Sequence, residues 1–296
     1  MLVSPDLQAF TSGIVAALLD KFSPMLNLLQ SKLITPILLS WIAINLGALD
    51  AYGQAVAEPA EIAAEAEAKT DRPKPVEEAR ESYMGRVLAA PMSHLGASWL
   101  VRPERELEEN ATRAFDQLQL RQGMKVCDLG CGNGYWTLPM ARTIGKDGTV
   151  YAVDIQVEML QQLKARTGRA RLANVEPILG DVDDPRLPKD VAIDLLLMVD
   201  VYHEFSHPES MLWAIRNSLG PSGVVALLEY REEDPLVPIK PLHKMSKSQI
   251  MKEYQSNGFK LVREYNDLPW QHLMFFARDD SPLAAIEPIA FSAAKP

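Results

Sequence analysis

Residues 126–136, which read Val-Cys-Asp-Leu-Gly-Cys-Gly-Asn-Gly-Tyr-Trp, constrain the fold more than any other part of this chain. An apolar stretch that ends in Asp128 leads into three alternate glycines, and residues 135–144 have helical character. Strand, glycine turn and helix in this order form a unit that brings bare backbone close to a nucleotide-like ligand. Glycine is needed because side chains would block the ligand and because some turn positions require a positive φ.

The spacing of the glycines bears on the identity of that ligand. The dinucleotide-binding pattern G-x-G-x-x-G would place its third glycine at position 135, where this chain has Tyr135. Asp128 stands two residues before the first glycine, Gly130. A carboxylate at that place repels a pyrophosphate and favours a ligand that carries an ammonium group.

Acidic residues also close the next three predicted strands. Residues 149–154 end in Asp154, residues 175–180 are followed by Asp181, and residues 192–199 are followed by Asp200. In open α/β sheets, ligands bind outside the carboxyl ends of the strands. These carboxylates are therefore candidate ligand-binding groups.

The pattern Asp-x-Gly-x-Gly-x-Gly at 128–134, with the acids after it, resembles the motifs of the class I S-adenosylmethionine-dependent methyltransferases. The resemblance covers roughly residues 105–279. It implies that Asp128 and the glycine turn hold the methionine part of S-adenosylmethionine, that Asp154 accepts hydrogen bonds from both ribose hydroxyls, and that Asp181 and Val182 meet the adenine. The implied cofactor-binding residues are Asp128, Gly130, Cys131, Gly132, Asn133, Gly134, Asp154, Ile155, Asp181, Val182 and Asp200.

Two alternatives to a methyltransferase stay open from the sequence. An NAD-dependent oxidoreductase on a Rossmann-like fold explains Asp154 equally well, because an acid about 20 residues past the turn also binds NAD ribose. That alternative does not explain Asp128 or Asp181. A non-catalytic protein that binds S-adenosylmethionine would keep every one of these motifs.

The order of predicted elements indicates a doubly wound α/β fold. Strands alternate with helices, which is typical of a mostly parallel sheet with helices on both faces. Only residues 266–269 separate the last two strands, so these two must pair antiparallel. The predicted sheet thus has seven strands and a reversed last strand. The strands are expected at 124–129, 149–154, 174–180, 192–199, 222–229, 258–265 and 270–278, and the helices at 134–144, 156–166, 208–219 and 246–256.

Residues 200–205, Asp-Val-Tyr-His-Glu-Phe, follow the fourth strand and hold the candidate catalytic groups. This run lacks the Asn/Asp-Pro-Pro-Tyr/Phe motif of DNA and protein-amide methyltransferases, and so resembles the small-molecule branch of the family. His203 is the candidate base, since the unperturbed pKa of a histidine lies near working pH, and Glu204 and Tyr202 are second candidates. The alternative is that His203 packs beside the cofactor or caps the following helix.

Four residues have side chains of the kinds that bind metal ions: His203, Glu204, His243 and His272. Spacing in the sequence does not show whether these residues meet, and scattered histidines are usually not ligands, so no metal is predicted. The charged run at 229–234, which includes Glu229 and Arg231, is interpreted as a solvated loop. The alternative is that Glu229 or Arg231 contacts the acceptor.

The segment before the first strand, residues 81–120, is predicted to form a helical lid. Apolar residues recur at helical spacing within 84–100 and 103–120. The resemblance implies that such a lid closes over the substrate, whereas plain packing on the sheet is the alternative. Residues 81–86, together with Trp99, Arg102 and Arg105, form a second candidate surface for an anionic or planar acceptor.

The first 57 residues have a different character, that of an apolar leader. Residues 33–49 carry no charge, Lys32 precedes them, and an Ala-x-Ala pattern follows at 55–57. This arrangement is typical of a signal peptide or a membrane anchor and predicts membrane association through residues 26–49. The expected location is membrane-associated or exported (periplasmic), with cytoplasmic as the alternative. Residues 58–80 are expected to be a linker, 81–120 the lid, 121–280 the catalytic domain and 281–296 a tail.

The composition bears on two further points, a nucleic-acid partner and disulfide bonds. The net charge of −9 argues against a nucleic-acid partner, because phosphate binding draws on a basic face. The only cysteines, Cys127 and Cys131, both lie in the first strand and turn, which excludes a disulfide framework. The sequence therefore predicts a small-molecule acceptor, and it leaves the oligomeric state open.

Overall fold

A computed structural model describes residues 79–291 of the chain. The predicted leader, nearly all of the predicted linker and the last five residues of the tail lie outside the described residues. Among the helices of 79–291, none has the length and apolar character needed to cross a membrane.

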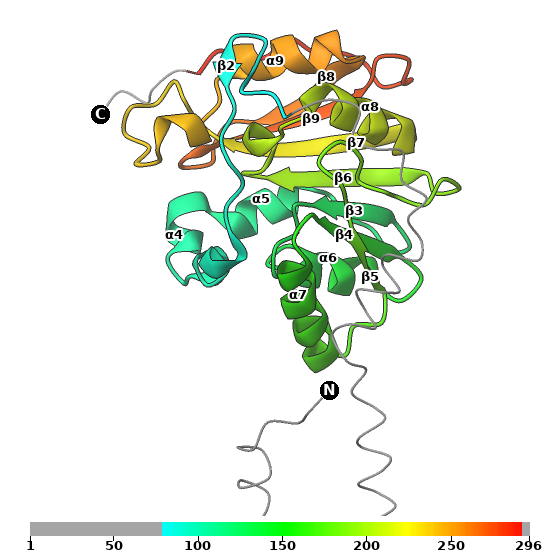
Figure 1. Ribbon diagram of the computed structural model, residues 1–296. Coiled ribbons are helices and arrows are strands. Elements are labelled where there is room, and N and C mark those ends of the chain that lie inside the picture. Colours follow the sequence, from blue (N-terminus) through cyan, green and yellow to red (C-terminus); the bar gives the residue numbers. More distant parts are fainter. Residues whose placement is uncertain (1–78, 292–296) are drawn as a thin grey trace, which may run out of the picture. The chain divides into compact units, whose positions relative to one another are not determined.

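A seven-stranded sheet forms the centre of residues 79–291, in the order β5-β4-β3-β6-β7-β9-β8 (Figure 1). The first five strands in this order are parallel, and β9 is antiparallel to both of its neighbours. The predicted fold class, with its reversed last strand, is confirmed. The strands are β3 (Lys125–Leu129), β4 (Thr149–Asp154), β5 (Val175–Leu179), β6 (Ile193–Val199), β7 (Leu219–Tyr230), β8 (Phe259–Tyr265) and β9 (Gln271–Arg278).

Strand β9 is last in the chain but not last in the sheet. It inserts between β7 and β8, which leaves β8 at the edge. The short 266–270 connection makes β8 and β9 a hairpin, as the sequence predicts. The chain runs outward from β3 through β4 to β5 and then returns to β6 on the other side of β3, so that the switch in strand order lies between β3 and β6. In open α/β sheets this is where ligands bind.

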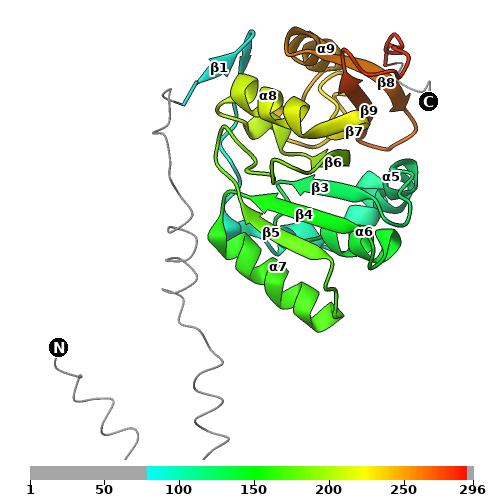
Figure 2. The same cartoon turned by 90° about the vertical axis from the view of Figure 1, so that its right-hand side faces the viewer.

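Helices cover both faces of the sheet (Figures 1 and 2). On one face α8 (Pro208–Ser218) and α9 (Lys247–Ser256) pack on Leu196 and Met198 of β6. On the other face α5 (Ala111–Gln117) and α6 (Thr137–Ile144) share a core with Leu195 and Leu197. Successive side chains of a strand point to opposite faces, so a strand that is covered on both sides must be apolar throughout. This explains the apolar run at 195–199 of β6, whereas Asp194, near the start of the strand, is exposed.

Helix α7 (Val157–Ala170) follows β4 and buries Leu163 against the glycine turn. A side chain at Gly134, where φ is +88°, would place its Cβ 2.3 Å from Cδ1 of Leu163. Gly134 is therefore needed for the close packing of helix α7 on the turn.

The predicted helix within residues 84–100 is wrong. This segment forms a two-stranded hairpin, β1 (Ser82–Tyr83) and β2 (Arg86–Val87), followed by two short 3₁₀ turns, η1 (His94–Gly96) and η2 (Trp99–Val101). The two residues of the hairpin turn, Met84 and Gly85, both have positive φ, as the tightest hairpins require. The apolar spacing did not predict this structure correctly, because Ala89 and Ala97 are buried whereas Val87 and Leu95 are exposed, so the apolar side chains share no single buried face.

The expected helix within 103–120 is two helices, α4 (Arg105–Glu109) and α5. Asn110 stands between them with φ of 52°, and its side chain accepts a hydrogen bond from the backbone N–H of Arg113. An asparagine tolerates this left-handed conformation and caps the new helix, which turns the chain.

Candidate functional site

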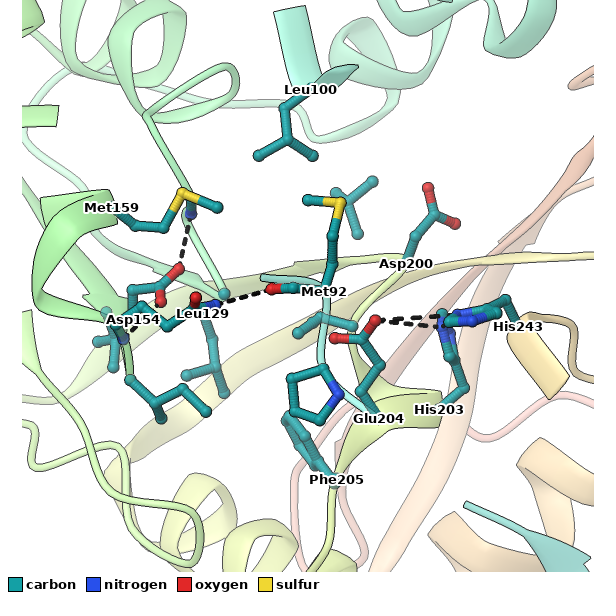
Figure 3. Close-up of a pocket in the computed structure, with 18 of the residues that line it drawn as sticks. Met92, Leu100, Leu129, Asp154, Met159, Asp200, His203, Glu204, Phe205 and His243 are labelled. Atoms are coloured by element: carbon teal, nitrogen blue, oxygen red, sulfur yellow. Dashed lines mark hydrogen bonds and ion pairs between the residues drawn. The ribbon is translucent and has the colours of Figure 1, made fainter. Parts of the chain in front are cut away.

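A cavity of about 510 Å³ opens at the carboxyl ends of β3, β4, β6 and β7 (Figure 3). This volume lies within the range of small-ligand pockets. Its walls come from the glycine turn, from residues 91–105 and from the loop at 238–243. Nine of the predicted site residues line it: Gly130, Gly132, Asp154, Ile155, Asp181, Val182, Asp200, His203 and Glu204.

Asp154 lies at one end of the cavity, at the tip of β4 (Figure 3). One carboxylate oxygen accepts a hydrogen bond from the backbone N–H of Gly132 at 2.9 Å, and the other accepts from that of Gln156 at 2.9 Å. Burial raises the pKa of Asp154, while these two N–H groups oppose the rise. The carboxylate is thus fixed in position and retains free lone pairs toward the cavity.

Asp181 and Asp200 are held in different ways. Asp181 pairs with Arg186 at 2.9 Å and accepts from the backbone N–H of Val182. Asp200 accepts two hydrogen bonds from Nε2 of Gln271, at 2.9 and 2.8 Å, and has a left-handed φ of 53°. Burial raises the pKa of Asp200 well above its usual value, and the nearby carboxylates add to this.

Four predicted cofactor-binding residues do not line the cavity: Asp128, Cys131, Asn133 and Gly134. The buried carboxylate of Asp128 accepts a hydrogen bond from the hydroxyl of Thr137. The Asn133 side chain donates to the carbonyl of Ala97 and accepts from Arg166. Both cysteines are buried free thiols. Cys131 and Asn133 alternate with the lining residues Gly130 and Gly132 and so face away from the cavity, whereas Asp128 lies within β3 and is buried.

Asp128 makes stability depend on pH. Burial raises its pKa from 3.8 to about 6, so between these values the folded protein binds more protons than the unfolded chain, and stability falls as the pH rises. Asp128→Asn keeps an acceptor for Thr137 without the buried charge. We expect the variant to be more stable by roughly 1–3 kcal/mol at pH 7.5, with no advantage near pH 4. Urea unfolding of the ligand-free proteins at both values measures this.

Asp147→Asn is the control for Asp128→Asn, because it makes the same change at an exposed position. It should show no such change between the two pH values. A gain for Asp128→Asn that is equally large at pH 4 would contradict the assignment to the buried charge.

A cluster of two histidines and two glutamates lies at the opposite end of the cavity, where His203, Glu204 and His243 form part of the lining and Glu229 is fully buried. His203, 2% exposed, contacts Glu229 through Nδ1 at 2.7 Å and His243 through Nε2 at 2.9 Å. Its backbone N–H donates to the other oxygen of Glu229 at 3.2 Å. Oε1 of Glu204 lies 3.9 Å from Nε2 of His203 and 3.8 Å from Nδ1 of His243. Figure 3 shows Glu204 facing both rings.

Burial and charge act on this cluster in opposite directions. Burial works to lower the pKa of His203, but the contact with Glu229 and the charges of Glu204 and Asp200 together outweigh it, so the pKa of His203 lies above its usual value. Burial raises the pKa of Glu204 to about 7. Burial and then the charge of His203 lower the pKa of His243.

The structure brings together three of the four residues that were considered for a metal. His203 and Glu204 belong to the 3₁₀ turn η3 (Tyr202–Glu204), and His243 ends the turn η4 (Pro241–His243). His272 lies apart from this group of ligand atoms and instead contacts Glu233 at 2.8 Å.

Several site residues were not predicted. Gln156 donates from its side chain to the carbonyl of Met92, which ties the 91–105 wall to the tip of β4. Tyr230 also lines the cavity and donates to the buried Glu109 at 2.9 Å. Glu109 also accepts a hydrogen bond from Arg105. Arg105 lines the cavity too, although the sequence suggested it only as part of a second acceptor surface. Gln156 follows the tip of β4 and Tyr230 is the last residue of β7, and this position at a strand end was the signal in the sequence that could have indicated them.

Comparison with known proteins places the chain in a family. A family model described as "Methyltransferase domain" matches residues 120–274, just over half of the chain. The chain therefore belongs to this methyltransferase family, and it is a class I S-adenosylmethionine-dependent methyltransferase by fold and motifs. A solved S-adenosylmethionine-dependent methyltransferase from Aquifex aeolicus has the same fold, with a TM-score of 0.59 at 22% identity over 63% of this chain and 98% of that one.

The similarity to curated relatives is partial. A protein-L-isoaspartate O-methyltransferase from Methanothrix thermoacetophila is 44% identical over 66 residues, which are 22% of this chain and 31% of that protein. A demethylmenaquinone methyltransferase from Staphylococcus aureus is 29% identical over 43% of this chain and 51% of its own length. The chain thus spans about half or less of these relatives.

Proposed function

We propose that this protein transfers a methyl group from S-adenosylmethionine to a small-molecule acceptor. The observation that carries this proposal is that one cavity joins the predicted cofactor residues at its Asp154 end to the His203 cluster at the other. Donor and acceptor can therefore meet without leaving the pocket, and positioning of this kind supplies much of the rate in a displacement reaction.

The charge of the cavity fits a sulfonium donor. The carboxylates of Asp154 and Asp181 line its donor end, and opposite charges stabilise each other more strongly away from bulk water. The acceptor atom attacks the methyl carbon, the carbon–sulfur bond breaks with its electrons going to sulfur, and the donor leaves as a neutral thioether. The acceptor's proton, where it has one, leaves at the His203 end.

A small molecule is the acceptor class that we propose over nucleic acid. The cavity is walled by residues 91–105 and 238–243, and the chain carries a net charge of −9. An acidic protein lacks the excess of basic groups that phosphate backbones require. Demethylmenaquinone and coclaurine methyltransferases, which are named for small acceptors, are among the relatives.

Calorimetry on the pure protein tests the donor. We expect heat on titration with S-adenosylmethionine and with S-adenosylhomocysteine, and none with NAD. A methyl-labelled donor incubated with a metabolite extract then tests turnover. Binding of NAD alone would overturn the proposal in favour of an oxidoreductase, and donor binding without labelled product would favour the non-catalytic alternative.

We also propose that residues 26–49 associate with a membrane while the catalytic domain faces the cytosol. The support is the uncharged run at 33–49, and the cytosol is where the donor is made. Cell fractionation that finds the full chain wholly in the soluble fraction, or in the periplasm, would contradict this.

A further inference from the structure

Three potential ligand atoms in the acceptor end of the cavity form a compact triangle. Nε2 of His203 and Nδ1 of His243 are 2.9 Å apart, and Oε1 of Glu204 lies 3.9 and 3.8 Å from them. The point equidistant from all three lies about 2.1 Å from each atom, which matches the length of a bond from Zn²⁺ to histidine nitrogen or carboxylate oxygen. We propose that His203, Glu204 and His243 bind a divalent transition-metal ion.

The surroundings of His203 are those of a metal ligand. Glu229, which is fully buried, accepts from Nδ1 and so fixes the tautomer that leaves the lone pair of Nε2 free. Histidines that bind metals almost always donate their other ring N–H to a carboxylate or carbonyl in this way. A second contact, from the His203 backbone N–H to Glu229, holds the carboxylate in place.

A hydrogen bond between the two rings is the competing explanation. It accounts for the 2.9 Å distance between the histidines, but it leaves Glu204 beyond hydrogen-bonding distance of both rings. A cation accounts for the three distances together. It would also neutralise carboxylates in a cavity wall that already includes Asp200 and Glu204.

The metal ion at this site would bind the acceptor. Two histidines and one carboxylate supply three ligands and leave coordination positions open toward the cavity, as in catalytic rather than structural metal sites. This inference rests on the proposed function and refines it: the acceptor would carry an oxygen that binds the ion, such as a phenol, an enol or a hydroxy acid. Binding would lower the pKa of that hydroxyl, its proton would pass to water, and the oxygen would attack the methyl carbon.

Cobalt titration of the full-length protein tests the site without relying on activity. After removal of metals with a chelator, we expect one Co²⁺ per chain to bind with visible absorption bands that Zn²⁺ abolishes. His243→Ala, which changes a partly exposed loop residue, should weaken binding at least tenfold. Glu229→Gln should weaken it by about 10–100-fold through the loss of orientation. His94→Ala, which removes a histidine outside the cavity lining, should have no effect.

Two outcomes would overturn the metal site: no stoichiometric Co²⁺ binding by the wild-type protein, or equal binding by the wild type and His243→Ala. Calorimetry of the chelated protein with S-adenosylmethionine separates this failure from failure of the proposed function. Donor binding with no metal binding would remove the ion and leave the methyltransferase intact, whereas loss of donor binding would count against the function itself.

Discussion

Asp154→Ala should bind S-adenosylmethionine at least about a hundredfold more weakly than the wild-type protein. In the proposed complex, its carboxylate accepts two hydrogen bonds from the ribose, and hydrogen bonds to a charged group contribute about 1.5–3 kcal/mol each. Asp154 is already oriented by the backbone N–H groups of Gly132 and Gln156, so it loses little freedom when the ligand arrives. Calorimetric titration with the donor and with S-adenosylhomocysteine measures the loss.

Two further variants make the Asp154 result interpretable. Glu158→Ala removes an exposed carboxylate from the neighbouring helix and should leave donor affinity unchanged. Asp154→Asn keeps one acceptor oxygen, so its affinity should fall between the wild type and Asp154→Ala. If Asp154→Ala stayed folded by circular dichroism and bound the donor normally, the ribose role of this residue would be wrong.

His203→Ala should lower kcat by about 10²–10⁴-fold and change the donor dissociation constant by less than about threefold. His203 lies at the acceptor end of the cavity, away from Asp154 (Figure 3), so its loss removes a group that deprotonates or positions the acceptor without touching the donor. Single-turnover kinetics with a saturating labelled donor separates the two effects. This split between turnover and donor binding would not follow from a general loss of structure.

Glu229→Gln tests whether His203 depends on its buried partner. Glutamine fills the same space and can still contact Nδ1 but carries no charge, so we expect a smaller fall in kcat than for His203→Ala. Full turnover by His203→Ala would show that His203 takes no part in the reaction.

The sheet was predictable because its signal is local. An apolar run of five to eight residues between turn residues specifies a strand that is buried on both faces, and β6 shows this clearly. The reversal of β9 followed from the short 266–270 connection alone. The positions of Asp154, Asp181 and Asp200 in the cavity then followed from a general rule about strand ends.

Predictions were less accurate where they depended on the direction of a side chain or on contacts with residues distant in the sequence. Asp128 was expected to line the donor site, but its carboxylate accepts from Thr137 outside the cavity lining, and its role toward the donor stays a prediction. The segment 84–100 had helical spacing but folds as a hairpin and two short turns. Neither result is visible in periodicity, because both depend on what the rest of the fold places around these residues.

Sequence alone determined the order and type of the central elements, the glycine turn and the acids at the strand tips, since hydrophobic pattern and turn chemistry act over short stretches of chain. Tertiary structure alone decided that His203, Glu204, Glu229 and His243 form one cluster. Forty residues separate the two histidines, and no local pattern encodes their meeting. It results from the packing of strands β6 and β7, which brings η3 and the loop that ends in η4 to the same edge of the sheet.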